Sequence, residues 1–119
     1  NEALKINRHL AEKNPDAFLP NVAATLNNLI LLNIENPKEA EKYLEECLPI
    51  RRKFAQLSPD AQNLELARTL IFGGFVYEAL ENSALSQACF KEALSIAEQY
   101  PQVPLAQQLI QLAEKKNKK

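Results

Sequence analysis

The sequence predicts an all-α protein, built as a right-handed superhelical stack of about six antiparallel helices. Three observations predict this fold: two segments 44 positions apart are nearly the same, apolar residues recur at helical spacing in both, and the chain of 119 residues has only two glycines. So few glycines argue against a turn-rich β protein. A repeated pair of helices is typical of an α-solenoid, in which each hairpin buries its apolar face against the next.

The duplication is visible residue by residue. Residues 2–28 align with residues 46–72 without a gap, and eleven of the 27 pairs are identical. Average composition would give roughly two identities. A third copy of the first half, KEALSIAEQY at 91–100, aligns with EECLPIRRKF at 45–54. We therefore expect one domain over 1–119, divided into the end of a partial repeat (1–14), two repeats (15–58 and 59–101) and a C-terminal capping helix (102–119).

The first helix is expected at about 1–13. The chain starts without Met, and EALKI reads as the middle of a helix, which favours a fragment or a processed piece. Ala3, Ile6 and Leu10 form its apolar stripe. These side chains are expected to lack part of their neighbour, which predicts weak self-association, a homodimer formed through this end.

The second and fourth helices are expected at about 17–34 and 60–82. Val22, Leu26 and Leu29 form the apolar stripe of the second helix. Asp16 and Asp60 each follow a proline, which predicts that they cap these helices. The adjacent glycines at 73 and 74 lie inside the helical pattern, where they favour a close approach of helices over a phosphate-binding loop.

The third and fifth helices are expected at about 37–56 and 84–99. Their apolar residues follow the same steps of four, three, three and four positions, which is one stripe of an amphipathic helix. The two stripes are Ala40, Leu44, Cys47, Ile50 and Phe54, and Ser86, Phe90, Ala93, Ile96 and Tyr100. Pro49 is expected to cause a mild kink and not a break.

The sixth helix is expected at about 102–117. Leu105, Leu109 and Leu112 form one stripe and the remainder is polar, so this helix is expected to cap the open end of the stack. The KKNKK segment at 115–119 is typical of a solubilising tail.

Composition argues against several classes of partner. The net charge of −1 gives no dominant basic face for phosphate backbones, so we expect no nucleic-acid partner. No run of about 18 apolar residues is present, so we expect no membrane-spanning helix. A protein or peptide partner remains.

No constellation of catalytic residues is present, so we expect no enzyme activity and no cofactor. His9 is the single histidine and lies on the polar side of a terminal helix. Cys47 and Cys89 have neither CxxC spacing nor a neighbouring histidine, so they are expected to be small core residues and not zinc ligands. Unpaired cysteines fit a reducing compartment, which favours a cytoplasmic location.

The segment GGFVYEALENSALSQACFKEAL at 73–94 resembles the tetratricopeptide repeat family. Gly74, Tyr77, Phe90 and Ala93 match the small and aromatic positions of the family, and Ser86 stands where its first alanine usually lies. In the preceding unit Ile30 and Asn33 replace the glycine and the aromatic residue, so packing there is expected to differ. LNNL at 26–29 and a repeat longer than 40 residues are similar to the long variant found in kinesin light chains and in many bacterial repeat proteins.

The resemblance implies an interaction scaffold, in which the first helices of the hairpins line a concave groove that binds a peptide or a partner helix. The alternative is a regulatory or sensor segment that packs against other domains of a longer chain. A helical wheel that turns the stripe at 22, 26 and 29 toward the core turns other positions toward the groove. The predicted partner-binding residues are Ala24, Asn27, Asn28 and Leu31, with Arg68, Ile71, Phe72 and Phe75 in the next unit.

Within this set the resemblance implies that paired asparagines hold an extended peptide, because each carboxamide offers a donor and an acceptor. The Lys and Asn pattern of a carboxylate clamp is missing, so a peptide with apolar side chains is favoured over a free acidic C-terminus. Arg68 would be available for one acidic group. The opposing interpretation stays open: Asn27 and Asn28 are exposed polar residues without a role, and Phe72 and Phe75 complete the core.

Overall fold

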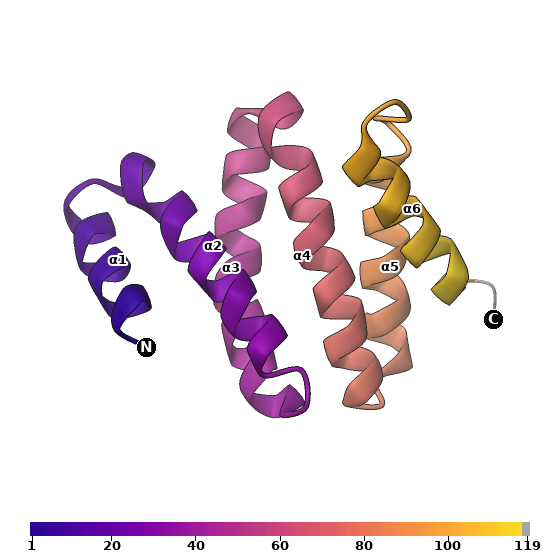
Figure 1. Ribbon diagram of the computed structural model, residues 1–119, viewed down its shortest axis with the longest axis horizontal. Helices are drawn as coiled ribbons and strands as arrows, with labels where there is room; N and C mark the ends of the chain where they lie inside the picture. Colours follow the sequence, from indigo (N-terminus) through magenta and orange to yellow (C-terminus); the bar gives the residue numbers. More distant parts are fainter. Residues whose placement is uncertain (118–119) are drawn as a thin grey trace.

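The computed structural model describes residues 1–117, and in this part of the chain every regular element is a helix (Figure 1). The prediction of an all-α protein with about six helices is confirmed. The bounds differ from those expected by at most a few residues. The helices are α1 (Glu2–Lys13), α2 (Pro15–Leu32), α3 (Pro37–Leu57), α4 (Pro59–Ala79), α5 (Ser83–Ala97) and α6 (Pro104–Asn117).

The helices form two layers. Each helix packs on the next one along the chain, and in addition the backbones of α2 and α4, and of α4 and α6, approach each other closely, whereas those of α1 and α3, and of α3 and α5, do not. The layer of α2, α4 and α6 lies in front in Figure 1, and α3 and α5 lie behind it. Because only the backbones of the front helices approach closely across the stack, the stack is closer packed on that side. The right-handed sense of the superhelix and the repeat boundaries stay predictions.

Prolines set where several helices begin. Pro15 and Pro59 occupy the first positions of α2 and α4, where the missing N–H costs nothing and the fixed φ suits a helix. The prediction that Asp16 and Asp60 cap these helices is wrong, because the cap positions fall one residue before each proline, at Asn14 and Ser58. Both aspartates lie instead in the first turn, where the positive end of the helix dipole favours a carboxylate.

The two repeated stripes bury the same positions. Ala40, Leu44 and Cys47 of α3 are fully buried, and so are their counterparts Ser86, Phe90 and Ala93 of α5, at no more than 3% exposure. The last two residues of each stripe are partly buried. Cys47 and Cys89 are both free and buried, as expected for core residues. Helix α3 continues without a break through Pro49, as expected.

The glycine pair lets α4 approach α5 closely. A Cβ at Gly74 would lie 2.5 Å from the ring of Phe90, far inside van der Waals contact. At Gly73 it would lie 3.2 Å from Sγ of Cys89 and 3.3 Å from Leu44. Ser86 also belongs to this contact, since its hydroxyl donates to the carbonyl oxygen of Gly74 at 2.9 Å. The close helix approach predicted for the glycines is confirmed.

Helix α6 packs on α5 and on α4. The core receives Ala106, Leu109 and Ala113 from it. Lys116 belongs to the packed part and not to a tail as expected, because its Nζ binds both carboxylate oxygens of Glu78 at 3.0 and 3.1 Å. The rest of the predicted tail, at 118–119, lies outside the described residues. No helix within residues 1–117 has the length and apolarity needed to cross a membrane.

Candidate functional site

An apolar cavity of about 390 Å³ opens in the front layer between α2, α4 and α6. We call it the front groove. Its lining residues are Leu31, Ile34, Ile71, Phe72, Phe75, Glu78, Ala79 and Leu112. Three of the large apolar side chains in it remain exposed to a considerable extent: Leu31 at 49%, Leu112 at 41% and Ile34 at 37%.

Phe75, which α4 contributes to the front groove, is held in position by packing on α5. The ring of Phe75 meets that of Phe90 edge to face, with centroids 5.4 Å apart, and Phe90 is itself fixed against Gly74. On the α6 side, Nζ of Lys116 lies 5.4 Å from the centroid of Phe75 while it pairs with Glu78. The aromatic wall is therefore positioned before any partner arrives, which lowers the entropy cost of binding.

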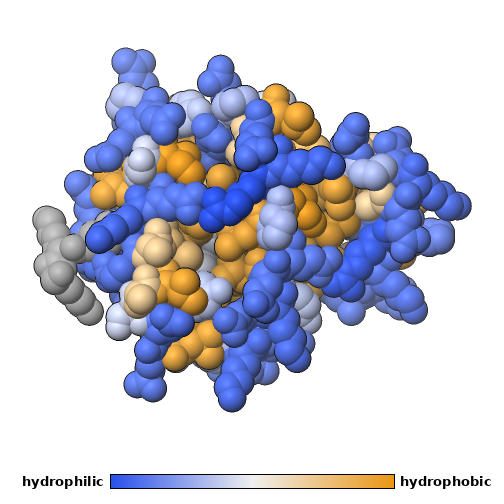
Figure 2. All heavy atoms as spheres, turned by 180° about the vertical axis from the view of Figure 1, so that it is seen from behind, coloured by the Kyte–Doolittle hydropathy of each residue, from blue (hydrophilic) through white to orange (hydrophobic). Residues whose placement is uncertain are grey.

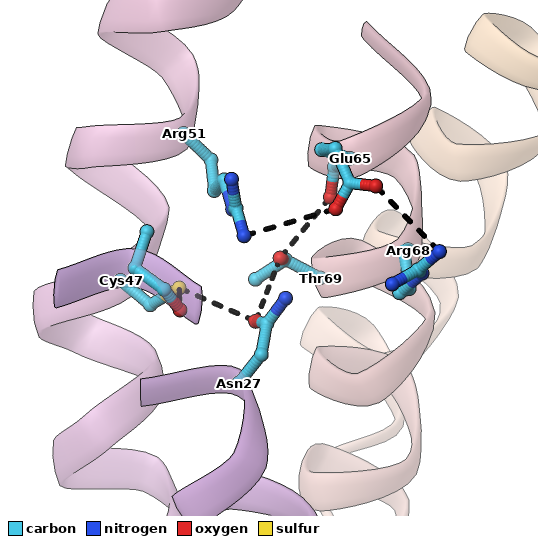
Figure 3. A network of polar contacts seen from close by, with 7 residues as sticks. Asn27, Cys47, Arg51, Glu65, Arg68 and Thr69 are labelled. Carbon is cyan, nitrogen blue, oxygen red and sulfur yellow. Dashed lines mark hydrogen bonds and ion pairs between the residues drawn. The ribbon is translucent and has the colours of Figure 1, made fainter. Parts of the chain in front are cut away.

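Next to the groove, a small polar network connects α2, α3 and α4 (Figure 3). Oδ1 of Asn27 accepts from the Thr69 hydroxyl at 2.9 Å and from the Cys47 thiol at 3.3 Å. Burial raises the pKa of the Cys47 thiol, and the nearby charge of Arg51 opposes that effect. The thiol therefore stays protonated near neutral pH and can donate. The network ties α2 to α4 at the level of the groove floor.

Arg51, Glu65 and Arg68 continue this network toward the start of α4. Nη2 of Arg51 lies 3.8 Å from one carboxylate oxygen of Glu65, and Nη2 of Arg68 lies 3.5 Å from the other. The Arg51 side chain is only 7% exposed, and its Nε has no hydrogen-bond partner. Figure 3 shows Arg51 reaching from α3 toward the Glu65 carboxylate on α4.

The structure brings part of the predicted partner-binding set together. Leu31, Ile71, Phe72 and Phe75 line the front groove, although Ile71 is 1% exposed and forms its floor. Ala24 and Asn28 are exposed on α2, outside that lining, and Arg68 is partly buried beside Glu65.

One of the predicted residues does not face the open side. Asn27 is 6% exposed, so the expectation that it points outward is wrong. The reason is that α2 and α4 contact each other, and this contact covers the inner edge of the groove-facing surface. The side-chain oxygen of Asn27 accepts hydrogen bonds from Thr69 and Cys47, so this residue connects α2 to α4 and α3.

Sequence reasoning missed Ile34, Leu112 and Arg51. Ile34 follows α2 in a loop, and Leu112 was assigned to the stripe of a capping helix. A signal for Arg51 exists: in the repeat alignment it stands opposite Asn7 in one copy and opposite Ala97 in the other, so a charged residue occupies a core position.

The opposite face of the stack has a different character. Figure 2 shows hydrophilic side chains extending across and between the apolar areas of this face. Arg8 of α1 pairs with Glu46 of α3, and Arg52 of α3 pairs with Glu92 of α5, each through two hydrogen bonds. These bonds raise the pKa of both guanidinium groups. Within residues 1–117, no group of three or more His, Cys, Asp or Glu side chains could hold a metal ion.

A stack of helical hairpins, each packed on the next, is the arrangement found in the class of helical-repeat proteins. Residues 67–100, which run from α4 through α5, match the family model of the tetratricopeptide repeat. The match supports a tetratricopeptide repeat family, whose members generally mediate protein–protein interactions and are typically non-catalytic scaffolds. Comparisons with curated proteins and with solved structures gave no match.

Proposed function

We propose that this protein is an interaction scaffold whose front groove binds a partner protein through an extended peptide segment with apolar side chains. The observation that carries the proposal is the combination of an open apolar groove with half-exposed Leu31 and Leu112 on its two sides. Removing such side chains from water would contribute about 25 cal/mol per Å² of apolar surface. The tetratricopeptide repeat match over α4 and α5 supports this role.

Of the two asparagines that the resemblance to kinesin-light-chain repeats implies for peptide binding, we propose that only one binds the partner. Asn28 is exposed on α2, so its carboxamide is free to bind a peptide backbone, whereas Asn27 is engaged inside. We infer that one asparagine of the LNNL segment serves the partner and the other serves the fold. Ala24 and Arg68 would extend the contact surface beyond the front groove.

The first test compares two leucines of similar exposure. Leu31 lines the front groove at 49% exposure, and Leu85 lies on the first turn of α5 at 45% exposure, outside the groove. Peptides selected from a random display library on the unmodified protein are expected to bind at least about tenfold more weakly to Leu31→Glu, since a charge is then placed in an apolar contact. Leu85→Glu is expected to bind them as the unmodified protein does.

Shift mapping by NMR places the same peptides on the surface. The expected footprint covers Leu31, Phe72, Phe75 and Leu112. A footprint confined to 38–53 and 84–99, on the helices of the rear layer, would contradict the proposal.

A second candidate function is a regulatory segment that packs against other domains of a longer chain. It is favoured by the outer face of α1, where Ile6 is 55% exposed. By the repeat alignment α1 corresponds to α3 and α5, which each have two helices packed on them, while α1 packs on α2 and reaches α3 through the Arg8–Glu46 pair. In this case Ile6→Glu would abolish the interaction with the other domain, and Leu31→Glu would leave it intact.

A further inference from the structure

Arg51 is a buried cation whose Nε–H has no hydrogen-bond partner. A guanidinium group has five N–H donors in a fixed fork. At Arg51 the side chain is 7% exposed, Nε has no partner, and the nearest carboxylate oxygen, on Glu65, lies at 3.8 Å, beyond hydrogen-bond distance. A buried charge that is neither paired closely nor hydrogen-bonded destabilises a fold. Its presence therefore needs a reason other than packing.

The repeat alignment shows that the fold itself does not require an arginine here. The counterpart in the next unit, Ala97, is fully buried. The counterpart in the preceding unit, Asn7, donates to the hydroxyl of Thr25 at 3.2 Å. Thr69 corresponds to Thr25, yet it is engaged with Asn27. Small or neutral residues thus fill this position elsewhere in the chain.

The charges around Arg51 do not balance. Glu65 is placed between Arg51 and Arg68, at 3.8 and 3.5 Å, so two guanidinium groups share one carboxylate (Figure 3). Neither distance is that of a short charge-assisted hydrogen bond, which would be about 2.7 to 2.9 Å. By contrast, Arg8 and Arg52 each have a carboxylate of their own with two hydrogen bonds. The excess positive charge marks this point as suited to a second carboxylate.

We propose that Arg51, together with Arg68, receives the carboxylate of an Asp or Glu side chain from the peptide that occupies the front groove. The inference rests on the proposed function and names part of the partner's chemistry. The two terminal nitrogens of Arg51 are the ones that can meet a carboxylate in a bidentate arrangement, while the sealed Nε stays inside. Glu65 then remains with Arg68, and each guanidinium group has a counter-charge.

The geometry also sets where the acidic residue stands in the peptide. Arg68 precedes Phe72 by four residues and Phe75 by seven, which is a rise of about 6 to 10 Å along α4. An extended peptide advances about 3.3 Å per residue. The acidic residue is therefore expected two or three positions from the large apolar residue that enters the front groove.

The first experiment uses acetate as the probe and the four arginines of the chain as reporters. Sodium acetate is titrated against sodium chloride at equal ionic strength while the Nε–H signals are followed by NMR. Arg51 and Arg68 are expected to shift saturably with acetate, and Arg8 and Arg52, whose carboxylates are already in place, are expected to stay. Equal movement of all four, or movement of none, would overturn the proposal.

The second experiment compares peptides selected on the unmodified protein, on Arg51→Met and on the control Arg52→Met, which changes the next residue on the outer face. Peptides from the unmodified protein and the control are expected to carry Asp or Glu two or three positions from an apolar anchor, and to bind Arg51→Met about tenfold or more weakly. Peptides that bind the groove without that acidic residue would contradict the inference about Arg51 but would still support the proposed function. If no peptide maps to the groove, the proposed function fails, and the acetate titration alone decides whether Arg51 receives a carboxylate.

Discussion

Individual residues determine how closely the helices can approach, and Gly74 shows this most sharply. We expect Gly74→Ala to lower the free energy of unfolding by about 1 to 3 kcal/mol, because the new methyl group would lie 2.5 Å from the Phe90 ring. Alanine is the better helix former by about 0.5 to 1 kcal/mol, which offsets part of this cost. Gly73→Ala, with contacts at 3.2 Å, is the matched control and should lose less. Urea denaturation measures both, and equal stability of the two variants would contradict the expectation.

Whereas Gly74→Ala is expected to destabilise the protein, a substitution at Arg51 is not. Replacing it by Met removes a buried charge whose Nε–H is unpartnered, and Glu65 keeps Arg68 as its partner, so the free energy of unfolding is expected to stay level or to rise by about 1 kcal/mol. Arg52→Met, which breaks an exposed pair with Glu92, should cost at most about 1 kcal/mol. Thermal denaturation of the two variants separates these outcomes. A strong loss of stability for Arg51→Met would show that the arginine is needed by the fold.

At the scale of elements, the sequence predicted the amphipathic helices better than the apolar ones. Helices α3 and α5 have one clear stripe each, and the first three residues of each stripe are buried. Helix α4 is surrounded by four other helices, and its buried positions run almost all round it, from Leu66 to Val76. A helical wheel cannot separate core from groove on such a helix. This is why the wheel does not show that Ile71 is the buried floor of the groove, or that Asn27 on α2 is buried.

Only the part of the groove that depends on local helical geometry could be predicted from the sequence. Leu31, Phe72 and Phe75 follow from helical geometry within one or two helices. Ile34 and Leu112 enter through a loop and a later helix, whose positions depend on tertiary packing. The role of Arg51 depends on a contact between α3 and α4 that no local pattern reports.

Helix α6 provides a prediction at this scale. Leu109 is 4% exposed against α5 and α4, while Leu112, one turn later, is 41% exposed in the front groove. Leu109→Ala is expected to cost about 2 to 5 kcal/mol, because it leaves a cavity in the core. Leu112→Ala should change the free energy of unfolding by well under 1 kcal/mol and serves as the control. Chemical denaturation followed by circular dichroism checks both, and similar losses would show that the position of α6 is wrong.

The whole molecule has two unlike ends. Helix α6 turns Gln107, Gln108 and Gln111 to solvent, and we propose that it caps the stack. Helix α1 instead leaves Ile6 exposed at 55%. We expect weak self-association through α1 that Ile6→Glu removes and Leu85→Glu does not, since an exposed apolar side chain gains from burial against a second copy. Light scattering over a range of concentrations tests this, and a chain that stays monomeric at high concentration would exclude it.

The two guanidinium–carboxylate pairs of the rear layer have a mechanical consequence. Arg8 with Glu46 and Arg52 with Glu92 connect helices whose backbones do not approach each other closely, whereas the backbones of the front-layer helices do. We therefore expect bending of the stack to stretch or relax the rear pairs before it disturbs the front contacts. Because dissolved salt screens such exposed pairs, the bending stiffness, and with it the width of the groove, should vary with ionic strength while the folded state persists.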